Sequence, residues 1–539
     1  MTHSHRSLEY RRFAAPREDR AALVDPPWEE VGGLIAANVR GKEPLAACQV
    51  QGRSLAELAA AARADLLAQA RQWTAAYRPV EPAAEDPRGL ILLAGHQPEL
   101  FHPGVWFKNF ALGSLALRYR ATAVNLVIDS DTVKSASLPV PGGTLEDPRR
   151  EAIPLDRPEP LVPYEERRVV DGELLADFGR RAAEQMASLV PHPLLGDFWP
   201  MVLQRRRHTD RLGYCLAQAR HQIEGRWGLR TQEVPQSWVC QSEPFRWFVM
   251  HLAAEAVRFR EVHNRAVEEY RRNNRIRSAA HPVPDLVQDG PWVELPLWVW
   301  TAESPRRRRL FVRHEGGGLL MSDRQGLEMR FPWGRPPDAA AAVEALADWS
   351  RRGVRIRSRA LVTTLWARLA LGDLFVHGIG GAKYDQVTDR LIERFFGLQP
   401  PGILVLSATL YLPVAVPQDA AQQARALRGA LRDLVFHAEL ANDPPLPREA
   451  RELVAAKRQW IETPQTPENA RQRWRSLREI NAALQPWVAQ HRRRLLERQA
   501  AAMHTLRAQR VLGWREYGFC LYPEKTLREF LEQLLPKNV

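Results

Sequence analysis

The chain has few of the features that mark secreted or membrane-spanning proteins. Its 539 residues include only four cysteines, which are widely scattered and show no pairing pattern. No apolar run approaches the ~18 residues that a membrane span needs, and the N-terminus lacks the apolar core of a secretory signal. We therefore expect a cytoplasmic protein with reduced thiols and without a membrane partner.

The motifs of the commonest hydrolases and zinc proteins are also missing. The sequence contains no HExxH, CxxC or GxSxG. His208, His221, His251 and His263 do not have the spacing of metal ligands. We therefore predict no metal site at these histidines.

Lysine is scarce, although the chain is basic. Lys and Arg number 76 against 63 Asp and Glu, a formal net charge of +13, but only seven of the 76 are lysine. Clusters such as Arg306 to Arg309 and Arg492 to Arg494 sit among acids and are not interleaved with exposed aromatic residues, so we interpret them as solvated faces and do not expect a nucleic-acid partner. Lysine is a compact charge that can lose its proton when buried, and three of the seven fall in unusual segments: Lys108, Lys134 and Lys383.

Two short apolar runs around a helical pattern indicate a parallel sheet. Residues 89–94 and 123–128 are continuous apolar runs, typical of strands buried on both faces, and residues 105–120 between them have helical periodicity. The same order returns later, with strands predicted at 373–376 and 402–406 around a helix at 384–396. We therefore predict an α/β protein with a Rossmann-like parallel sheet core.

The remaining segments have other patterns. Trp292 to Trp300 and Arg309 to Arg313 resemble strands of a hairpin-containing insertion, and the chain beyond 417 is almost wholly helical. We predict five parts: a helical lead-in (1–85), the first part of the core (86–140), a helical and β-hairpin insertion region (141–365), the second part of the core (366–416) and a C-terminal helical coiled-coil arm (417–539). The apolar stripe of the arm is too long for the core to cover, so we expect a homodimer.

The first segment that could carry chemistry links the first strand to its helix. Ligands of open α/β sheets lie beyond the carboxyl ends of the strands, and the helix start offers free N–H groups to an anion. The segment is dense in polar side chains, namely His96, Gln97, His102, Lys108 and Asn109. A polar connection that caps the helix is the alternative.

The second segment follows the next strand. Asp129 and Asp131 are two residues apart and point to the same side if the backbone stays extended, and Lys134 follows them. They could bind a metal, ribose hydroxyls or an amine. Capping of the next helix is the alternative.

The third segment is a glycine turn between a strand and a helix at residues 375–389. Its glycines let the backbone approach a ligand closely. The candidate residues are His377, Gly378, Gly380, Gly381, Lys383, Tyr384 and Asp385. If the strands ending at Ala94, Ile128 and Val376 are parallel neighbours, all three segments share one edge of the sheet.

Four stretches of the chain resemble motifs of the bacillithiol-biosynthesis cysteine-adding enzymes, a ligase family with a Rossmann-like core and a coiled-coil arm. Residues 95–101 are similar to that family's Gly-Gln-Gln-x-Gly-Leu loop, and residues 125–132 are similar to its apolar strand ending in Glu-Asp-His-Asp. Residues 380–405 are similar to its later glycine turn and the strand that follows, and residues 522–529 are similar to its terminal motif.

Several positions depart from that pattern. His96 replaces the first glutamine, Glu99 replaces a glycine, and Thr132 stands where the acidic cluster would have its histidine. The resemblance therefore implies a relative with an altered substrate. The His-Gln-Pro opening is also similar to a poorly described family of polysaccharide-locus proteins, which leaves the reaction open.

The prediction is a ligase or transferase that acts on a small amine- or thiol-bearing metabolite, with a nucleotide as a possible cofactor. His96 or Asp131 would act as general base, with Tyr384 as a further catalytic candidate. Lys108 and Lys383 would hold an anion, and the backbone of residues 378–381 would cradle a phosphate or carboxylate. The main alternative is a non-catalytic small-molecule or nucleotide-binding protein with a dimerising arm. A third possibility, nucleic-acid binding through the arginine clusters, predicts an affinity that depends strongly on salt.

Overall fold

The apolar runs predicted as strands lie at the centre of a six-stranded mixed sheet. The computed structural model describes residues 12–80, 87–159, 161–334, 338–414, 419–440 and 445–536. In sheet order the strands are β1 (Ala22–Asp25), β16 (Ile403–Ala408), β15 (Leu374–His377), β4 (Ile91–His96), β5 (Thr122–Val127) and β8 (Gln232–Pro235). The edge strand β1 runs antiparallel to β16, and the other four pairings are parallel. Neighbouring apolar runs thus pair as the sequence predicts.

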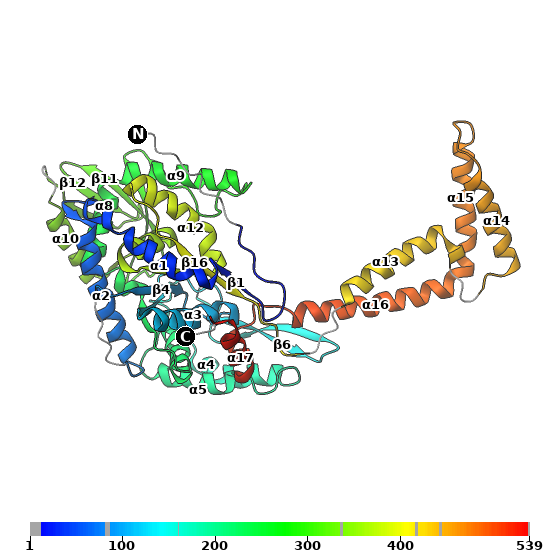
Figure 1. Ribbon diagram of the computed structural model, residues 1–539, viewed down its shortest axis with the longest axis horizontal. Coiled ribbons are helices and arrows are strands. Elements are labelled where there is room, and N and C mark those ends of the chain that lie inside the picture. Colours follow the sequence, from blue (N-terminus) through cyan, green and yellow to red (C-terminus); the bar gives the residue numbers. More distant parts are fainter. Residues whose placement is uncertain are drawn as a thin grey trace.

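Both faces of this sheet are buried, which explains why its strands are continuous apolar runs. Successive side chains of a strand point to opposite faces, so Leu93 packs into one hydrophobic core and Leu92 into another. Helices α2 (Leu55–Ala75) and α12 (Ile379–Leu391) contribute to the first core. Helix α3 (Pro103–Tyr119) contributes to the second core. Helices therefore cover the sheet on both faces (Figure 1).

The order of the parallel strands reverses between β4 and β15. From β4 the chain passes through α3 to β5 and then to β8 on one side, whereas from β15 it passes through α12 to β16 on the other. Helices α3 and α12 therefore leave adjacent strands toward opposite faces. A crevice between two such loops is where open α/β sheets bind ligands.

A second sheet, antiparallel throughout, lies in the insertion region. Its order is β13-β12-β11-β10-β14, and β9 also pairs with β10. The strands are β9 (Gln288–Asp289), β10 (Trp292–Thr301), β11 (Arg308–Glu315), β12 (Gly318–Ser322), β13 (Glu328–Pro332) and β14 (Val354–Ser358). Gly316 and Gly317, both with positive φ, form the turn between β11 and β12. The predicted hairpin is thus confirmed and is part of a larger sheet.

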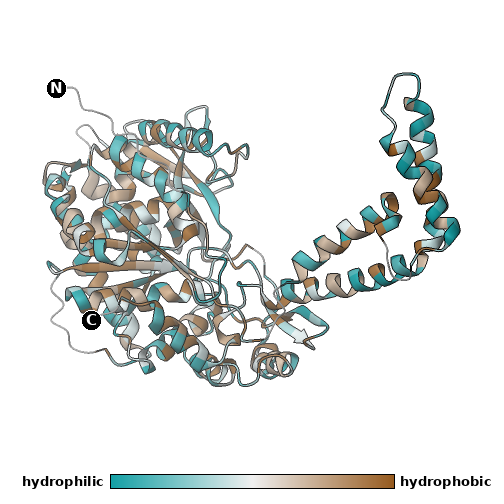
Figure 2. Ribbon diagram, turned by 45° about the vertical axis from the view of Figure 1, so that its right-hand side comes forward, coloured by the Kyte–Doolittle hydropathy of each residue, from teal (hydrophilic) through white to brown (hydrophobic). Residues whose placement is uncertain are grey.

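The helical arm projects from one side of the body (Figure 1). It consists of α13 (Ala420–Phe436), α14 (Arg448–Glu462), α15 (Ala470–Leu484) and α16 (Ala489–Leu512). Helix α13 packs on α16, and α14 packs on α15. Hydrophobic residues fill the strands of the body, whereas hydrophobic and hydrophilic residues alternate along the arm helices (Figure 2).

Three boundaries differ from the sequence prediction. The lead-in is not only helical, because β1 joins the main sheet as its edge strand. The insertion region contains β8, the fifth parallel strand. The arm ends near residue 512, because α17 (Glu524–Leu534) buries Leu527, Phe530 and Leu531 in the core of the body.

The other elements surround the two sheets. The short hairpins are β2 (Gln49–Val50) with β3 (Arg53–Ser54), and β6 (Ser137–Gly143) with β7 (Pro148–Pro154). The helices are α1 (Val31–Arg40), α4 (Gly172–Met186), α5 (Leu195–Arg206), α6 (Leu212–Arg226), α7 (Gln236–Val239), α8 (Glu243–Ala254), α9 (Ala256–Asn273), α10 (Ala339–Arg351) and α11 (Ala360–Trp366). Among the described helices, none combines the length and apolarity that crossing a bilayer would require.

Candidate functional site

The three segments singled out from the sequence meet at one edge of the main sheet. Strands β4, β5 and β15 are parallel neighbours, with Ala94 in register with both Asn125 and Val376. Their carboxyl ends therefore lie side by side, which confirms the predicted convergence. The loops after β4 and β5 also touch directly, because Gln97 donates a hydrogen bond of 3.1 Å from Nε2 to a carboxylate oxygen of Asp131.

Asp131 is the centre of this edge. Its other carboxylate oxygen accepts hydrogen bonds from the N–H of Thr132 at 2.8 Å and from Arg307 at 2.9 Å. The side chain keeps 24% exposure, so a ligand can reach it. Tyr384, at the start of α12, lies close enough that its pKa is raised to about 12, first by burial and then by the charges of Asp385 and Asp131.

Arg307 is a site residue that the sequence did not reveal. It precedes β11 of the second sheet and stacks on Trp298, with 4.8 Å from its guanidinium carbon to the ring centroid. The interpretation of Arg306 to Arg309 as a solvated face is wrong for this residue, since it binds Asp131 and the hydroxyl of Thr132. No local pattern could have paired residues so far apart in the chain.

A second acidic group lies beside Asp131. Burial raises the pKa of Glu99, against the opposing charge of the exposed Lys134. The hydroxyl of Tyr164 donates to Glu99 at 3.3 Å, and the pKa of Tyr164 is raised by burial and by the charges of Glu99 and Asp131. Glu99 and Tyr164 were also missed from the sequence.

Lys108 is a buried ammonium at the point where the strand order reverses. It is 4% exposed, and burial lowers its pKa to about 8. Its Nζ donates to the Gly95 carbonyl at 2.9 Å. Among the described residues it has no other hydrogen-bond acceptor and no carboxylate partner.

The start of α12 lies next to the aliphatic stem of Lys108. A Cβ added at Gly378, the N-cap, would stand 3.9 Å from Cδ of Lys108. The first backbone hydrogen bond of the helix runs from the N–H of Ala382 to the Gly378 carbonyl, so the preceding N–H groups, including those of Gly380 and Gly381, are not used in the helix. Lys383 is exposed.

Two predicted residues lie in a polar network beneath the edge. His96 is 5% exposed, and its Nε2 pairs with Oδ1 of Asn109 at 3.2 Å. Asn109 in turn donates to Glu224 at 2.8 Å. The pKa of His96 is far below its usual value because of burial and the charges of Arg220 and Lys108. This placement favours a positioning role for His96.

Two other predicted residues, His102 and Asp129, hold the scaffold. His102 caps α3, its Nδ1 accepting from the N–H of Gly104 at 3.1 Å, and burial lowers its pKa to about 3. Asp129 is fully buried and accepts hydrogen bonds from the hydroxyl of Tyr214 at 2.8 Å and from the N–H of Ser237 at 2.9 Å. Burial, and then the charge of Glu165, raises the pKa of Asp129 to about 7.

The pair His377 and Asp385 is also structural. His377 Nε2 lies 3.0 Å from a carboxylate oxygen of Asp385, which Arg368 also contacts at 2.7 Å. Burial opposes the charge on Asp385, but Arg368 and His377 hold its pKa below the usual range. The ring of His377 fills the space where a Cβ on Gly381 would lie, 2.4 Å from Nδ1. Glycine is therefore required at this position.

One buried group has the residue types of a metal site. Among the described residues, ligand atoms of His221, Glu224 and Glu233 lie within 4.8 Å of one another. Arg220 forms an ion pair with each of the two carboxylates. The guanidinium thus already supplies a positive charge there.

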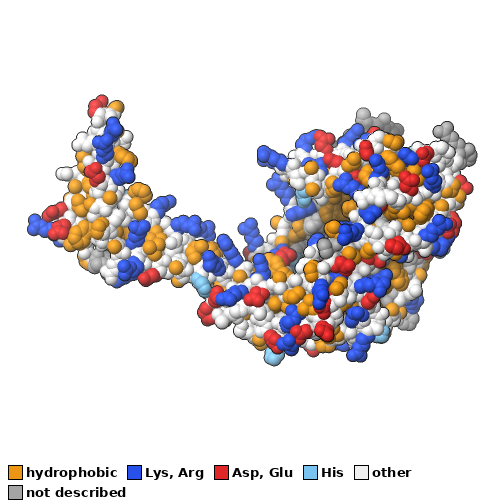
Figure 3. Space-filling model, turned by 180° about the vertical axis from the view of Figure 1, so that it is seen from behind, with side chains coloured by type: hydrophobic (Ala, Val, Ile, Leu, Met, Phe, Trp, Pro, Cys, Tyr) orange, Lys and Arg blue, Asp and Glu red, His pale blue; other side chains and the backbone are white. Residues whose placement is uncertain are grey.

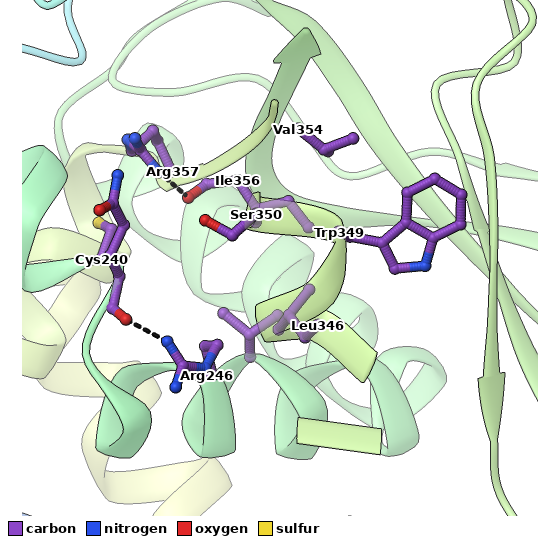
Figure 4. A pocket seen from close by; sticks show the side chains of 10 residues that line it. Cys240, Arg246, Leu346, Trp349, Ser350, Val354, Ile356 and Arg357 are labelled. Carbon is purple, nitrogen blue, oxygen red and sulfur yellow. Dashed lines mark hydrogen bonds between the residues drawn. The ribbon is translucent and has the colours of Figure 1, made fainter. Parts of the chain in front are cut away.

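Two hollows lie away from the edge. One is a groove beside β16 that includes Glu29, Glu30 and Asp389. The other is a small pocket at Cys240, and Figure 4 shows Arg246 and three α10 residues around it. Burial raises the pKa of the Cys240 thiol to about 11, which leaves little thiolate at neutral pH. Neither hollow contains a residue predicted as a site from the sequence.

The edge therefore combines a buried cation that no described carboxylate neutralises, a helix N-terminus and an accessible carboxylate within one group of loops. His96, Asn109 and Asp129 lie beneath it, and Lys134 and Lys383 are on the surface. The sequence matches no known family model and no curated protein.

Proposed function

We propose that the protein is an enzyme with a Rossmann-like core that binds the anionic group of a small metabolite between β4 and β15. The observation that carries this proposal is Lys108, a buried ammonium without a carboxylate partner in the described part of the chain. Burying an unpaired charge is costly, so a natural role for it is to meet an anion that arrives from solvent.

The first turn of α12 supports the same ligand. Free N–H groups at a helix N-terminus, together with the helix dipole, favour negative charge. Gly378 and Gly380 let the backbone approach a ligand, since a Cβ at Gly380 would meet nothing within 4 Å. A phosphate or a carboxylate fits these donors, so a nucleotide is one candidate for the bound molecule.

Asp131 is the candidate general base. It is partly exposed, and Gln97 and Arg307 fix its orientation. A carboxylate so placed can accept a proton from an amine or a thiol of a second substrate. Tyr384, whose raised pKa keeps it protonated, is a candidate hydrogen-bond donor.

The reaction class that fits these groups is transfer or ligation onto an amine- or thiol-bearing metabolite. The resemblance to the bacillithiol cysteine-adding enzymes points to the same class. We further propose that the arm mediates dimerisation, because it carries exposed large apolar side chains, among them Val435, Phe436 and Leu440.

Calorimetric titration with ATP, pyrophosphate and L-cysteine tests the proposal. We expect at least one phosphate-bearing probe to bind the wild type and to bind Lys108→Met at least ~10-fold more weakly. Lys525→Met is the matched control, because its side chain is 87% exposed on α17 and its loss removes the same charge far from the edge. Equal binding by all three proteins would refute the assignment.

A second variant separates catalysis from binding. Asp131→Asn should retain anion binding while losing turnover in a coupled assay for ATP consumption with amine and thiol acceptors. Unchanged turnover in that variant would remove Asp131 from the chemistry. Binding without turnover by the wild type across such acceptors would favour the non-catalytic binding protein.

A further inference from the structure

The arm concentrates the positive charge of the chain. Residues 470–512, which span α15 and α16, contain ten arginines and two glutamates, a net charge of +8. The whole chain carries +13, so these 43 residues hold more than half of the excess. Lys and Arg side chains lie along the arm between its tip and the body (Figure 3).

Most of these arginines are free of acidic partners. Nine are exposed, and Arg494, one of the nine, has an interaction elsewhere in the structure. None of the other eight forms an ion pair with a described residue. The eight are Arg471, Arg475, Arg478, Arg492, Arg493, Arg498, Arg507 and Arg510. Within the cluster at Arg492 to Arg494, Arg492 and Arg493 are thus exposed and form no ion pair with a described residue.

Three arginines of α16 lie on one face. Arg492, Arg507 and Arg510 are separated by 15 and 3 residues, which places them within about 60° of one another around the helix. They span about 27 Å along the axis at 1.5 Å per residue. Leu496 and Met503 lie between them and are 47% and 37% exposed, so this face is turned away from α13.

Exposed aromatic rings accompany the charge. Trp474 is 59% exposed and Trp487 is 42% exposed. Arg478 lies over the Trp474 ring, with 5.3 Å from its guanidinium carbon to the centroid. Trp487 precedes Arg492 by five residues, so an exposed aromatic ring does lie close in sequence to this basic cluster.

We propose that the α15–α16 surface of the arm binds RNA that contains unpaired bases. Arginine forks match phosphate oxygens, and tryptophan faces stack on bases that are not in a duplex. An acidic protein would not require the exposed tryptophans. The arm is rooted where residues 512–515 approach the body, and Arg515 lies 3.4 Å from Ser407 near the carboxyl end of β16, so bound RNA would extend toward the catalytic edge.

Fluorescence anisotropy with a 20-nucleotide single-stranded RNA of mixed sequence tests this proposal on the full-length protein. We expect binding whose affinity falls steeply with salt. The triple variant Arg492→Gln, Arg507→Gln and Arg510→Gln should bind at least ~10-fold more weakly, and the slope of log affinity against log salt should fall by about 2, since each single-strand phosphate contact contributes about 0.7.

The control removes the same charge from the other side of the arm. Arg425→Gln, Arg428→Gln and Arg432→Gln change three exposed arginines of α13 and should reduce the affinity less than ~3-fold. Trp474→Ala should weaken RNA binding at least ~5-fold. Circular dichroism would confirm that the variants keep their helices.

Four outcomes would overturn the proposal. The first is that the wild type does not bind the RNA at 50 mM salt, and the second is that the two triple variants lose RNA affinity equally. The third is that duplex DNA or single-stranded DNA binds at least as tightly as the RNA. The fourth is that vesicles rich in phosphatidylserine bind more tightly than the RNA. The last outcome would assign the surface to an anionic membrane instead.

Discussion

Replacing Lys108 with methionine should stabilise the fold at neutral pH while abolishing anion binding. Burial lowers the pKa of Lys108 from 10.5 to about 8, and one pKa unit corresponds to about 1.4 kcal/mol. The ammonium therefore costs the folded state about 3 kcal/mol at pH 7. Methionine fills a similar volume without charge, and loss of the hydrogen bond to Gly95 costs about 1 kcal/mol. The expected net gain is about 2 kcal/mol.

The difference in unfolding free energy between the wild type and Lys108→Met should change with pH. Below pH 8 the lysine is protonated in both the folded and the unfolded state, so the folded wild type bears the full free-energy cost of burying the ammonium. Between about pH 8 and 10.5 the folded state loses this proton while the unfolded chain keeps it, so the wild type gains stability relative to Lys108→Met as the pH rises. Urea unfolding of both proteins at pH 7 and pH 10 measures the difference. Destabilisation of Lys108→Met by more than ~1 kcal/mol at pH 7, or a gap that does not narrow at pH 10, would refute the reasoning.

Two substitutions of buried contacts and one measurement of the oligomeric state test other parts of the structure. Gly381→Ala should lower the free energy of unfolding by about 1–3 kcal/mol, because the new Cβ meets His377, whereas Gly380→Ala should not destabilise in the same urea experiment. Glu165→Gln should cost about 3–5 kcal/mol, because the amide keeps only one of the two oxygens that accept from Arg357 at 2.8 Å and leaves the buried guanidinium without an opposing charge; a cost below ~1 kcal/mol would contradict this. Light scattering at micromolar concentration should give a dimer, and a monomer with a helical arm would count against the self-association proposal.

The central strands could be predicted because their pattern is local. Residues 91–96 and 122–127 are apolar on both faces, and the glycine turn after β15 marks the start of α12. The strands β1 and β8 were not predicted. Each has four residues, as β15 does, but no glycine turn follows either of them to mark its end.

The sequence predicted that the three candidate segments share one edge of the sheet, but it did not predict which of their side chains are buried and which are accessible. Whether a polar side chain faces solvent or the core depends on tertiary packing, which is why Asp129 is buried and Asp131 is accessible, although they are two residues apart. The contribution of Arg307 required the second sheet to approach the first. Of the three lysines singled out from the sequence, Lys108 is buried, whereas Lys134 and Lys383 are exposed.

A crystal structure of the protein soaked with pyrophosphate or ATP would test directly whether Lys108 binds an anion. We expect density for a phosphate group within hydrogen-bond distance of Lys108 Nζ and of the N–H groups at the start of α12. Phosphate density confined to the groove at Asp389 or to the arm, with the edge at Lys108 empty, would contradict this expectation.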